Sequence, residues 1–209
     1  ARPHQWVKSA FVLIGPLYGM ADGHVTLSQA VGPALLTALA FALASSSCYV
    51  VNDLFDVESD RLHLRKCRRP IASGVVSPGL AKVYALLLAM GSVGLTLALP
   101  SSVRLFVVIT IGLYIANVTI YSVWIKHMLI ADVMGLSLGF VFRVMGGCAA
   151  VGIAPSTWLL NTTFFLAMFL AFGKRLGERR TATGDAAAIR AVQASYTDEM
   201  LRMAVVVTA

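Results

Sequence analysis

Long apolar segments constrain the fold of this sequence more than any other feature. About 20 mostly apolar residues are needed for a helix to cross the hydrocarbon core of a bilayer. We place such segments near residues 7–21, 30–51, 79–99, 103–122, 128–151 and 156–173, and a seventh begins near residue 198. Only 13% of the residues are charged, against roughly a quarter in soluble domains. The sequence therefore predicts an all-α, polytopic transmembrane helical bundle that forms a single domain over residues 1–209.

The distribution of lysine and arginine predicts the orientation of this bundle. Basic residues gather before the first span and in two long loops, at about 52–78 and 174–197, whereas the intervening loops carry few. The positive-inside rule places such segments in the cytoplasm. We therefore assign the net charge of +7 to membrane topology and not to nucleic-acid binding. The prediction is a multi-pass protein of the cell membrane with both long loops facing the cytoplasm. We also expect the polypeptide to extend beyond Ala209, because the seventh span is cut short.

The first long loop opens with an acidic motif, Asn-Asp-Leu-Phe-Asp-Val-Glu-Ser-Asp, over residues 52–60. Asp53, Asp56 and Asp60 have the spacing i, i+3 and i+7, so on a helix they share one face. Carboxylates this close repel one another unless a cation lies between them, and oxygen ligands suit Mg²⁺. A solvated helix end is the alternative, but one aspartate would serve that purpose. We predict that the three aspartates bind Mg²⁺ and that, together with Asn52, they are catalytic.

A basic cluster follows the acidic motif directly. It contains Arg61, Arg65, Lys66, Arg68 and Arg69, and residues 70–74 (Pro-Ile-Ala-Ser-Gly) predict a turn behind it. The planar guanidinium group suits phosphate oxygens. Topology alone could account for two or three of these charges. We expect at least one residue of the cluster to bind phosphate, with Arg61 and Arg65 as candidates, but the sequence does not identify which.

Two charged residues lie inside the fifth apolar span. Asp132 and Arg143 are three helical turns apart, so they share a face about 16 Å apart along the axis. Charged groups at membrane depth usually face a wet cavity or a polar partner. We predict that both line one cavity; the alternative is that each is satisfied by a backbone or polar partner. Tyr121 and Lys126 flank the entrance to this span and are further candidates for substrate binding.

The second long loop begins with basic residues, whereas the first begins with the acidic motif. Lys174, Arg175 and Glu178 are candidates for substrate binding there, as is Lys8 before the first span. The two loops occupy matching places four helices apart, as in a pseudo-repeat whose ends close over one cavity. Residues 181–188 are small and have few anchoring side chains, so we expect a mobile flap.

These motifs resemble the UbiA superfamily of intramembrane prenyltransferases. The motif at 52–60 resembles the first aspartate-rich motif of that superfamily. The resemblance implies nine transmembrane helices around a cavity, of which about seven are present in this chain. A finer resemblance is to the decaprenyl-phosphate phosphoribosyltransferase branch. It rests on the following motifs, in order along the chain: RPxQWxK at 2–8, RLHxxKxxRPIASG at 61–74, YSxxxKxxxxxD at 121–132, FxxR at 140–143, and GKRxxE at 173–178 followed by Tyr196.

The second loop departs from ordinary prenyltransferases, which carry a second acidic motif there. A site that is acidic on one side and basic on the other suits a metal-bound diphosphate together with further phosphates. The resemblance thus implies Mg²⁺-dependent transfer of 5-phosphoribose from phosphoribosyl pyrophosphate to a polyprenyl phosphate of the decaprenyl type. Pyrophosphate would be released, and the product would serve cell-envelope glycolipid synthesis. Lys8, Lys126, Arg143, Lys174 and Arg175 would bind the phosphates, and Asp132 would bind ribose hydroxyls or orient Lys126.

Two other functions stay open at this point. A UbiA-type prenyltransferase would join a polyprenyl diphosphate to an aromatic or other acceptor and would need acidic residues in the second loop. A non-catalytic membrane subunit or an anion transporter is the third possibility, which the complete aspartate triad disfavours. The expected partners are both substrates and the membrane, without nucleic acid, and a homo-oligomer is possible.

Overall fold

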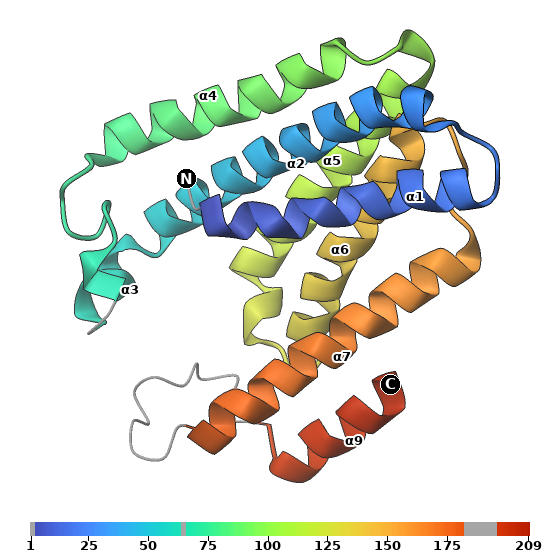
Figure 1. The fold of residues 1–209 in the computed structure, drawn as a ribbon. Helices are drawn as coiled ribbons and strands as arrows, with labels where there is room; N and C mark the ends of the chain where they lie inside the picture. The colour runs from blue at the N-terminus through green and yellow to red at the C-terminus, as the bar shows by residue number, and fades with distance from the viewer. Residues whose placement is uncertain (1–2, 64–65, 182–195) are drawn as a thin grey trace.

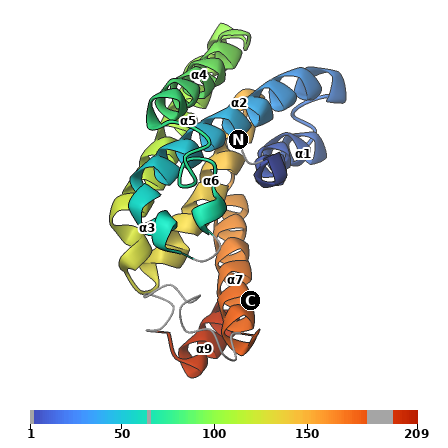
Figure 2. The ribbon, with the colours of Figure 1, turned by 90° about the vertical axis from the view of Figure 1, so that its left-hand side faces the viewer.

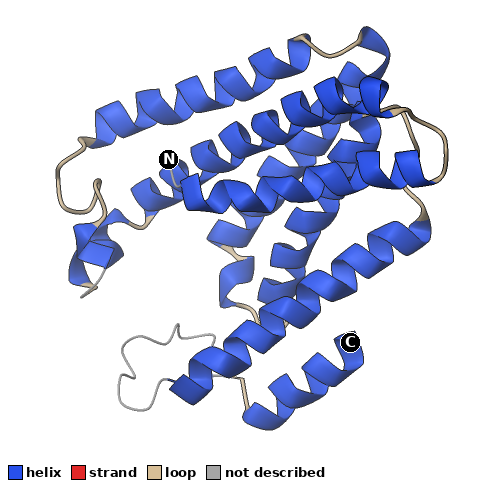
Figure 3. Ribbon diagram, in the orientation of Figure 1, coloured by secondary structure: helices blue, strands red, loops and turns tan. Residues whose placement is uncertain are grey.

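The computed structural model describes residues 3–63, 66–181 and 196–209, and for 3–5 and 178–181 it describes the backbone alone. In these residues all regular secondary structure is helical (Figure 3). The α-helices are α1 (Ile14–Ala21), α2 (Leu27–Phe55), α3 (Val57–Leu62), α4 (Pro78–Leu97), α5 (Ser101–Val123), α6 (Ala131–Ala150), α7 (Thr157–Thr181) and α9 (Asp198–Thr208). Three 3₁₀ segments join them, namely η1 (Pro3–Leu13), η2 (Lys66–Arg68) and η3 (Ile125–His127).

The predicted spans correspond to helices of the structure, and the all-α fold class is confirmed. Five helices, α2, α4, α5, α6 and α7, are long and apolar enough to cross a membrane. The first predicted span differs, because it is a shorter apolar helix over Trp6–Ala21 that begins as 3₁₀. The short α3 was not predicted as a separate helix. The lengths and composition of these helices are those of a multi-pass membrane protein.

Helix starts follow local capping chemistry. The Ser77 hydroxyl accepts a hydrogen bond from the Leu80 N–H, and Pro78 occupies the first turn of α4. At α9 the Thr197 hydroxyl accepts from the Met200 N–H. At α2 the Gln29 side chain accepts from the Thr26 N–H. Each cap satisfies backbone donors that would otherwise be unpaired at a helix start.

The helices pack as antiparallel neighbours (Figure 1). Helix α2 lies against α4, α5 against α6, α6 against α7, and α7 against α9. Helix α6 is central, because η1, α1, α2, α5 and α7 all contact it. Hydroxyl groups tie α2 to α4, where Ser47 donates to the Ala85 carbonyl and Ser92 to the Ala40 carbonyl, both over 2.8 Å. Such bonds between helices are typical of membrane bundles.

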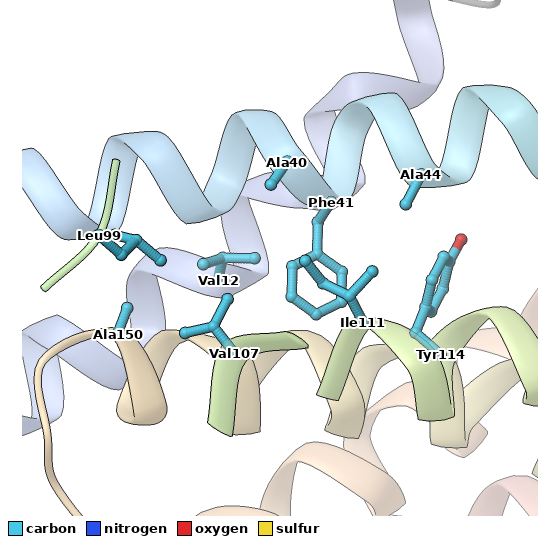
Figure 4. Close-up of a cluster of buried hydrophobic side chains, with 9 residues drawn as sticks. All are labelled: Val12, Ala40, Phe41, Ala44, Leu99, Val107, Ile111, Tyr114 and Ala150. Atoms are coloured by element: carbon cyan, nitrogen blue, oxygen red, sulfur yellow. The ribbon is translucent and has the colours of Figure 1, made fainter. Parts of the chain in front are cut away.

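Two adjacent glycines of α6 bring the N-terminal helix and α2 close to it. A Cβ at Gly147 would lie 1.8 Å from the Val12 carbonyl oxygen, and one at Gly146 would lie 2.4 Å from the Phe41 ring. Val12 and Phe41 belong to the main apolar core between η1, α2, α5 and α6 (Figure 4). The core therefore depends on small residues at the α6 surface.

The outward faces of α4 and α5 carry large exposed apolar side chains, such as Leu86, Leu87, Met90, Phe106 and Ile109. A soluble protein rarely exposes so much contiguous apolar surface.

The ends of α2 and α7 lie on the same side of the molecule as α3, the side that faces the viewer in Figure 2. The acidic motif and the second basic loop therefore start from one side of the bundle.

Candidate functional site

The acidic motif begins inside a helix and ends in another. Asn52 and Asp53 occupy the last turn of α2, Asp56 is the junction residue, and Asp60 lies in α3. Asp56 leaves helical geometry, with φ −90° and ψ 7°, but the backbone hydrogen bonds continue from Asp56 N to Asn52 O and from Asp60 N to Asp56 O. The helical hydrogen bonding therefore continues through the motif with a local bend at Asp56, and the shared face of the three aspartates stays a prediction.

Asp53 and Asp60 converge on a single guanidinium nitrogen. Arg69 Nη1 lies 3.1 Å from Asp53 Oδ1 and 2.6 Å from Asp60 Oδ2. The Asp60 side chain is only 2% exposed, and a buried carboxylate is costly unless a cation pairs with it. The third carboxylate has different partners. Asp56 Oδ2 accepts from the Asn52 amide, and Asp56 Oδ1 lies 3.3 Å from Lys126 Nζ.

The donor chemistry of this motif fits a divalent cation. Three carboxylates and an amide are hard oxygen ligands of the kind that Mg²⁺ takes, and cationic side chains stand against all three carboxylates. Within residues 3–63, 66–181 and 196–209, however, no three acidic, histidine or cysteine side chains are grouped closely enough to hold a metal in this conformation. The metal-ligand role of the three aspartates therefore stays a prediction.

Arg69 comes from a turn that is firmly held. Arg61 Nε donates to the Ala72 carbonyl over 3.2 Å, and Val76 N–H donates to the Pro70 carbonyl over 2.9 Å. Gly74 has φ +81°, which favours glycine at this point of the turn. Arg61, which we predicted to bind substrate, thus has a structural contact in the turn. Arg65, also predicted there, lies outside the described residues.

Lys126 links the acidic motif to the turn between α5 and α6. It lies in η3, and its ammonium pairs with Asp56 across 70 residues of sequence. Lys126 therefore pairs with Asp56 and not with Asp132 in this structure, and a role of Asp132 in orienting Lys126 stays a prediction. Tyr121, near the end of α5, packs beside Gly135, where a Cβ would lie 3.2 Å from Tyr121 Cδ2.

Asp132 forms a buried triad with Arg175 and Tyr196. Arg175 Nη2 lies 2.5 Å from Asp132 Oδ2, and the Tyr196 hydroxyl donates to Asp132 Oδ1 over 2.7 Å. The same hydroxyl accepts from the Ile130 N–H, and Ile130 has φ +63°, which is strained for a β-branched residue. Burial, and then the bond to Asp132, raise the pKa of Tyr196 to about 12. The triad joins α6, α7 and the segment before α9.

The triad changes how Arg175 and Asp132 are interpreted. We predicted a phosphate contact for Arg175 and a cavity-lining role for Asp132. Arg175 is 6% exposed and Asp132 is 1% exposed, and each already has a charged partner. Asp132 has polar and charged partners, Tyr196 and Arg175, as the alternative expected. Substrate contact by either residue stays a prediction. Glu178 lies at the end of α7, where side chains are not described.

Arg143 is buried in the middle of α6. Its Nη2 donates to the Tyr114 hydroxyl and its Nη1 to the Gly139 carbonyl, both over 2.9 Å. The Arg143 Nε atom is buried without a hydrogen-bond partner. No carboxylate pairs with Arg143 among the described side chains. A buried guanidinium with an unused donor and only neutral partners is suited to hold an anion.

Three cations from three elements lie near one another. The positive charges of Arg143 in α6 and Lys174 in α7 both act on the ammonium group of Lys8 in η1. Three positive charges that act on one another suit the binding of an anion. We predict that they form, with Lys126, which pairs with Asp56, the basic side of the candidate site.

Sequence reasoning identified most of these residues but missed three partners. It did not single out Arg69 from its cluster, and it gave no role to Tyr114. Tyr196 entered only through the resemblance. Each of the three acts through a partner at least nine residues away. No sequence spacing signals these contacts. The segment 182–188 of the predicted flap lies outside the described residues.

Comparison with known proteins decides the family. The profile of the UbiA prenyltransferase family matches residues 9–191. The chain belongs to this family. It is 39% identical over 201 residues to a decaprenyl-phosphate phosphoribosyltransferase of Corynebacterium glutamicum, covering 96% of this chain and 60% of that protein. It is 34% identical over 202 residues to the Mycobacterium tuberculosis protein of the same name, covering 96% of this chain and 66% of that protein. The chain thus spans about 60–66% of the length of these relatives.

The fold is also that of a solved UbiA protein. A UbiA homolog from Archaeoglobus fulgidus, bound to DMAPP and Mg²⁺, superposes with a TM-score of 0.76 at 19% identity, covering 99% of this chain and 71% of that chain. This likeness extends the family assignment from sequence to architecture. The resemblance drawn from the motifs is confirmed at the level of family and fold.

Proposed function

We propose that this UbiA-family protein transfers 5-phosphoribose from phosphoribosyl pyrophosphate to a polyprenyl phosphate of the decaprenyl type and releases pyrophosphate. The observation that carries the proposal is the presence of an acidic set and a basic set of side chains, joined by the contact of Asp56 with Lys126. Asn52, Asp53, Asp56 and Asp60 form the first. Lys8, Lys126, Arg143 and Lys174 form the second. The named relatives support the same activity.

We assign the metal–diphosphate end of the donor to the acidic side. Bound Mg²⁺ would supply Lewis-acid charge for the departing pyrophosphate, and the A. fulgidus homolog of the same fold is bound to DMAPP and Mg²⁺. Asp53, Asp56 and Asp60 would hold the cation, and Asn52 would orient Asp56 through its amide, 2.9 Å away. The carboxylates alone would repel a diphosphate, so this end of the site depends on the metal.

The basic side would hold the remaining phosphates. The donor carries a 5-phosphate and the lipid acceptor carries a monophosphate, so two anions need partners. Lys8, Arg143 and Lys174 are the proposed partners, and the unused Nε donor of Arg143 is part of that assignment. The lipid phosphate oxygen would form the bond to the anomeric carbon as the bond to pyrophosphate breaks. Because that oxygen is already an anion, the residues act by positioning and electrostatics and not as a general base.

We place Asp132, Arg175 and Tyr196 behind this site as positioning residues. Their buried triad fixes the start of α6 and the end of α7. Lys126 lies before α6 and Lys174 lies within α7, so the triad would set the distance between the acidic and basic sides. The site would face the cytoplasm of the cell, where phosphoribosyl pyrophosphate is available, and the product would serve envelope glycolipid synthesis.

The second candidate is a prenyltransferase that uses a polyprenyl diphosphate and another acceptor. The fold it shares with the DMAPP-bound homolog favours it. The two candidates differ in the last turns of α7, which the sequence predicted as a loop: a prenyltransferase should have acidic residues for a second metal there, but this chain carries Lys174 and Arg175. Retention of all three aspartates in a transferase family supports an enzyme over a transporter or a silent subunit.

A donor comparison on the purified full-length protein tests the proposal. With Mg²⁺ and decaprenyl phosphate, we expect pyrophosphate release from phosphoribosyl pyrophosphate and loss of that release in Asp53→Asn. The matched control is Glu58→Gln, which removes a nearby acidic charge outside the triad and should keep the activity. Turnover only with a polyprenyl diphosphate and an aromatic acid would assign the protein to the prenyltransferases.

A further inference from the structure

The clearest unexplained contact in the acidic motif is the bridge made by Arg69. One nitrogen, Nη1, lies within hydrogen-bond distance of both Asp53 and Asp60. Asp53 and Asp60 are seven residues apart and belong to two different helices. Arg69 therefore occupies the position at which a cation shared by these two carboxylates would sit. Its side chain is 26% exposed, so it also borders open space.

The backbone of Arg69 is fixed more firmly than its side chain. Arg69 N–H donates to the Lys66 carbonyl over 2.9 Å, and the Arg69 carbonyl accepts from the Ser73 N–H over 2.8 Å. Ile71, two residues on, is buried against Val50 and Ala81. The guanidinium can thus leave the carboxylates by rotation about side-chain bonds while the turn stays in place.

We propose that Arg69 is a diphosphate-binding residue whose guanidinium fills the space between Asp53 and Asp60 until a divalent cation enters. A guanidinium and a dication cannot share that space, because both are positive. Once displaced, Arg69 remains within one side-chain length of the carboxylates and of any diphosphate that their metal holds. Its planar donor fork suits two diphosphate oxygens. The inference rests on the proposed function only in needing a metal–diphosphate ligand, whichever group the diphosphate carries.

This exchange of partners makes metal and diphosphate binding interdependent. Metal alone must break the contacts of Arg69 with Asp53 and Asp60 and leaves the guanidinium without a partner. With diphosphate present, the displaced guanidinium gains a new anion. Each ligand should therefore increase the affinity for the other. Lys126 cannot substitute for Arg69 in this respect, since it pairs with Asp56.

The test measures metal binding without any donor substrate. Full-length protein in detergent would be titrated with Mn²⁺, followed by electron paramagnetic resonance, with and without inorganic pyrophosphate. In Arg69→Gln we expect Mn²⁺ alone to bind several-fold more tightly than in wild type. We expect the affinity gain from pyrophosphate to fall about tenfold, the value of one charge-assisted hydrogen bond. The control Arg68→Gln removes the neighbouring positive charge and should leave the pyrophosphate gain unchanged.

Arg69→Lys extends the test to a variant that keeps the charge. It should bind Mn²⁺ alone no more tightly than wild type, and it should keep a smaller pyrophosphate gain than arginine gives. The inference is overturned if Arg69→Gln binds Mn²⁺ alone equally or more weakly, or if its pyrophosphate gain equals that of wild type. If Arg69→Gln does not fold, an undiminished pyrophosphate gain in Arg69→Lys overturns it. These outcomes are independent of the donor, so a failure of the phosphoribosyl assignment would be seen separately.

Discussion

The buried pair of Asp132 and Arg175 gives the sharpest test of how the site is built. The side chains are 1% and 7% exposed, and their charged atoms are 2.5 Å apart. Removing one partner of such a pair leaves an uncompensated buried charge, which costs about 3–5 kcal/mol of unfolding free energy. We therefore expect Asp132→Asn to destabilise the protein by about that amount. The exposed Lys126–Asp56 pair, with side chains 27% and 28% exposed, should contribute about 1 kcal/mol or less.

The double variant Asp132→Asn/Arg175→Gln separates a structural from a ligand-binding role. Because it removes both charges, it should be more stable than the sum of the single variants implies, with a coupling energy of about 2 kcal/mol. The assay is the unfolding free energy in detergent, and the control is Lys174→Gln, an exposed neighbour expected within about 0.5 kcal/mol of wild type. Arg175→Gln with unchanged stability and weakened donor binding would refute the reasoning and make Arg175 a substrate ligand.

The remaining predictions concern the same architecture. Tyr196→Phe should cost about 2 kcal/mol of unfolding free energy, because it removes a bond to a buried carboxylate. Tyr84→Phe, on the exposed face of α4, should cost almost nothing in the same detergent assay. Gly147→Ala should abolish folded protein in a size-exclusion assay, because the new Cβ would lie 1.8 Å from a backbone carbonyl oxygen, whereas Gly112→Ala has open space and should fold normally. Chelation of divalent cations should stop pyrophosphate release, and added Mg²⁺ should restore it; activity that persists in chelator would contradict the metal assignment.

The apolar spans could be predicted because a membrane-spanning helix depends on a local run of apolar residues. Helices α2, α4, α5, α6 and α7 lie where runs of apolar residues indicated them. The N-terminal segment was less predictable, since η1 is 3₁₀ and only Trp6–Ala21 is apolar. The close approach of η1 to α6 depends on Gly147, which lies more than a hundred residues after η1 in the sequence. Composition does not encode that contact.

The candidate site was predicted as a list of residues but not as a set of partners. The aspartate spacing predicted a shared face, but in the structure Asp53 and Asp60 meet Arg69 whereas Asp56 meets Lys126. The choice of Arg69 among five basic residues depends on the turn at 69–76, whose hydrogen bonds no spacing rule specifies. Arg175 pairs with Asp132 across 43 positions of the sequence. Two charges that looked like ligands in sequence thus neutralise each other in the fold.

Identification of the lipid product tests the proposed phosphoribosyl transfer most directly. Full-length protein would be supplied with Mg²⁺, decaprenyl phosphate, phosphoribosyl pyrophosphate and a polyprenyl diphosphate together, and the lipids would be analysed by mass spectrometry. We expect a decaprenyl phosphate that carries one phosphoribosyl group, formed in equal amount to the pyrophosphate released. A prenylated acceptor as the only product, with phosphoribosyl pyrophosphate unconsumed, would contradict the proposed transfer.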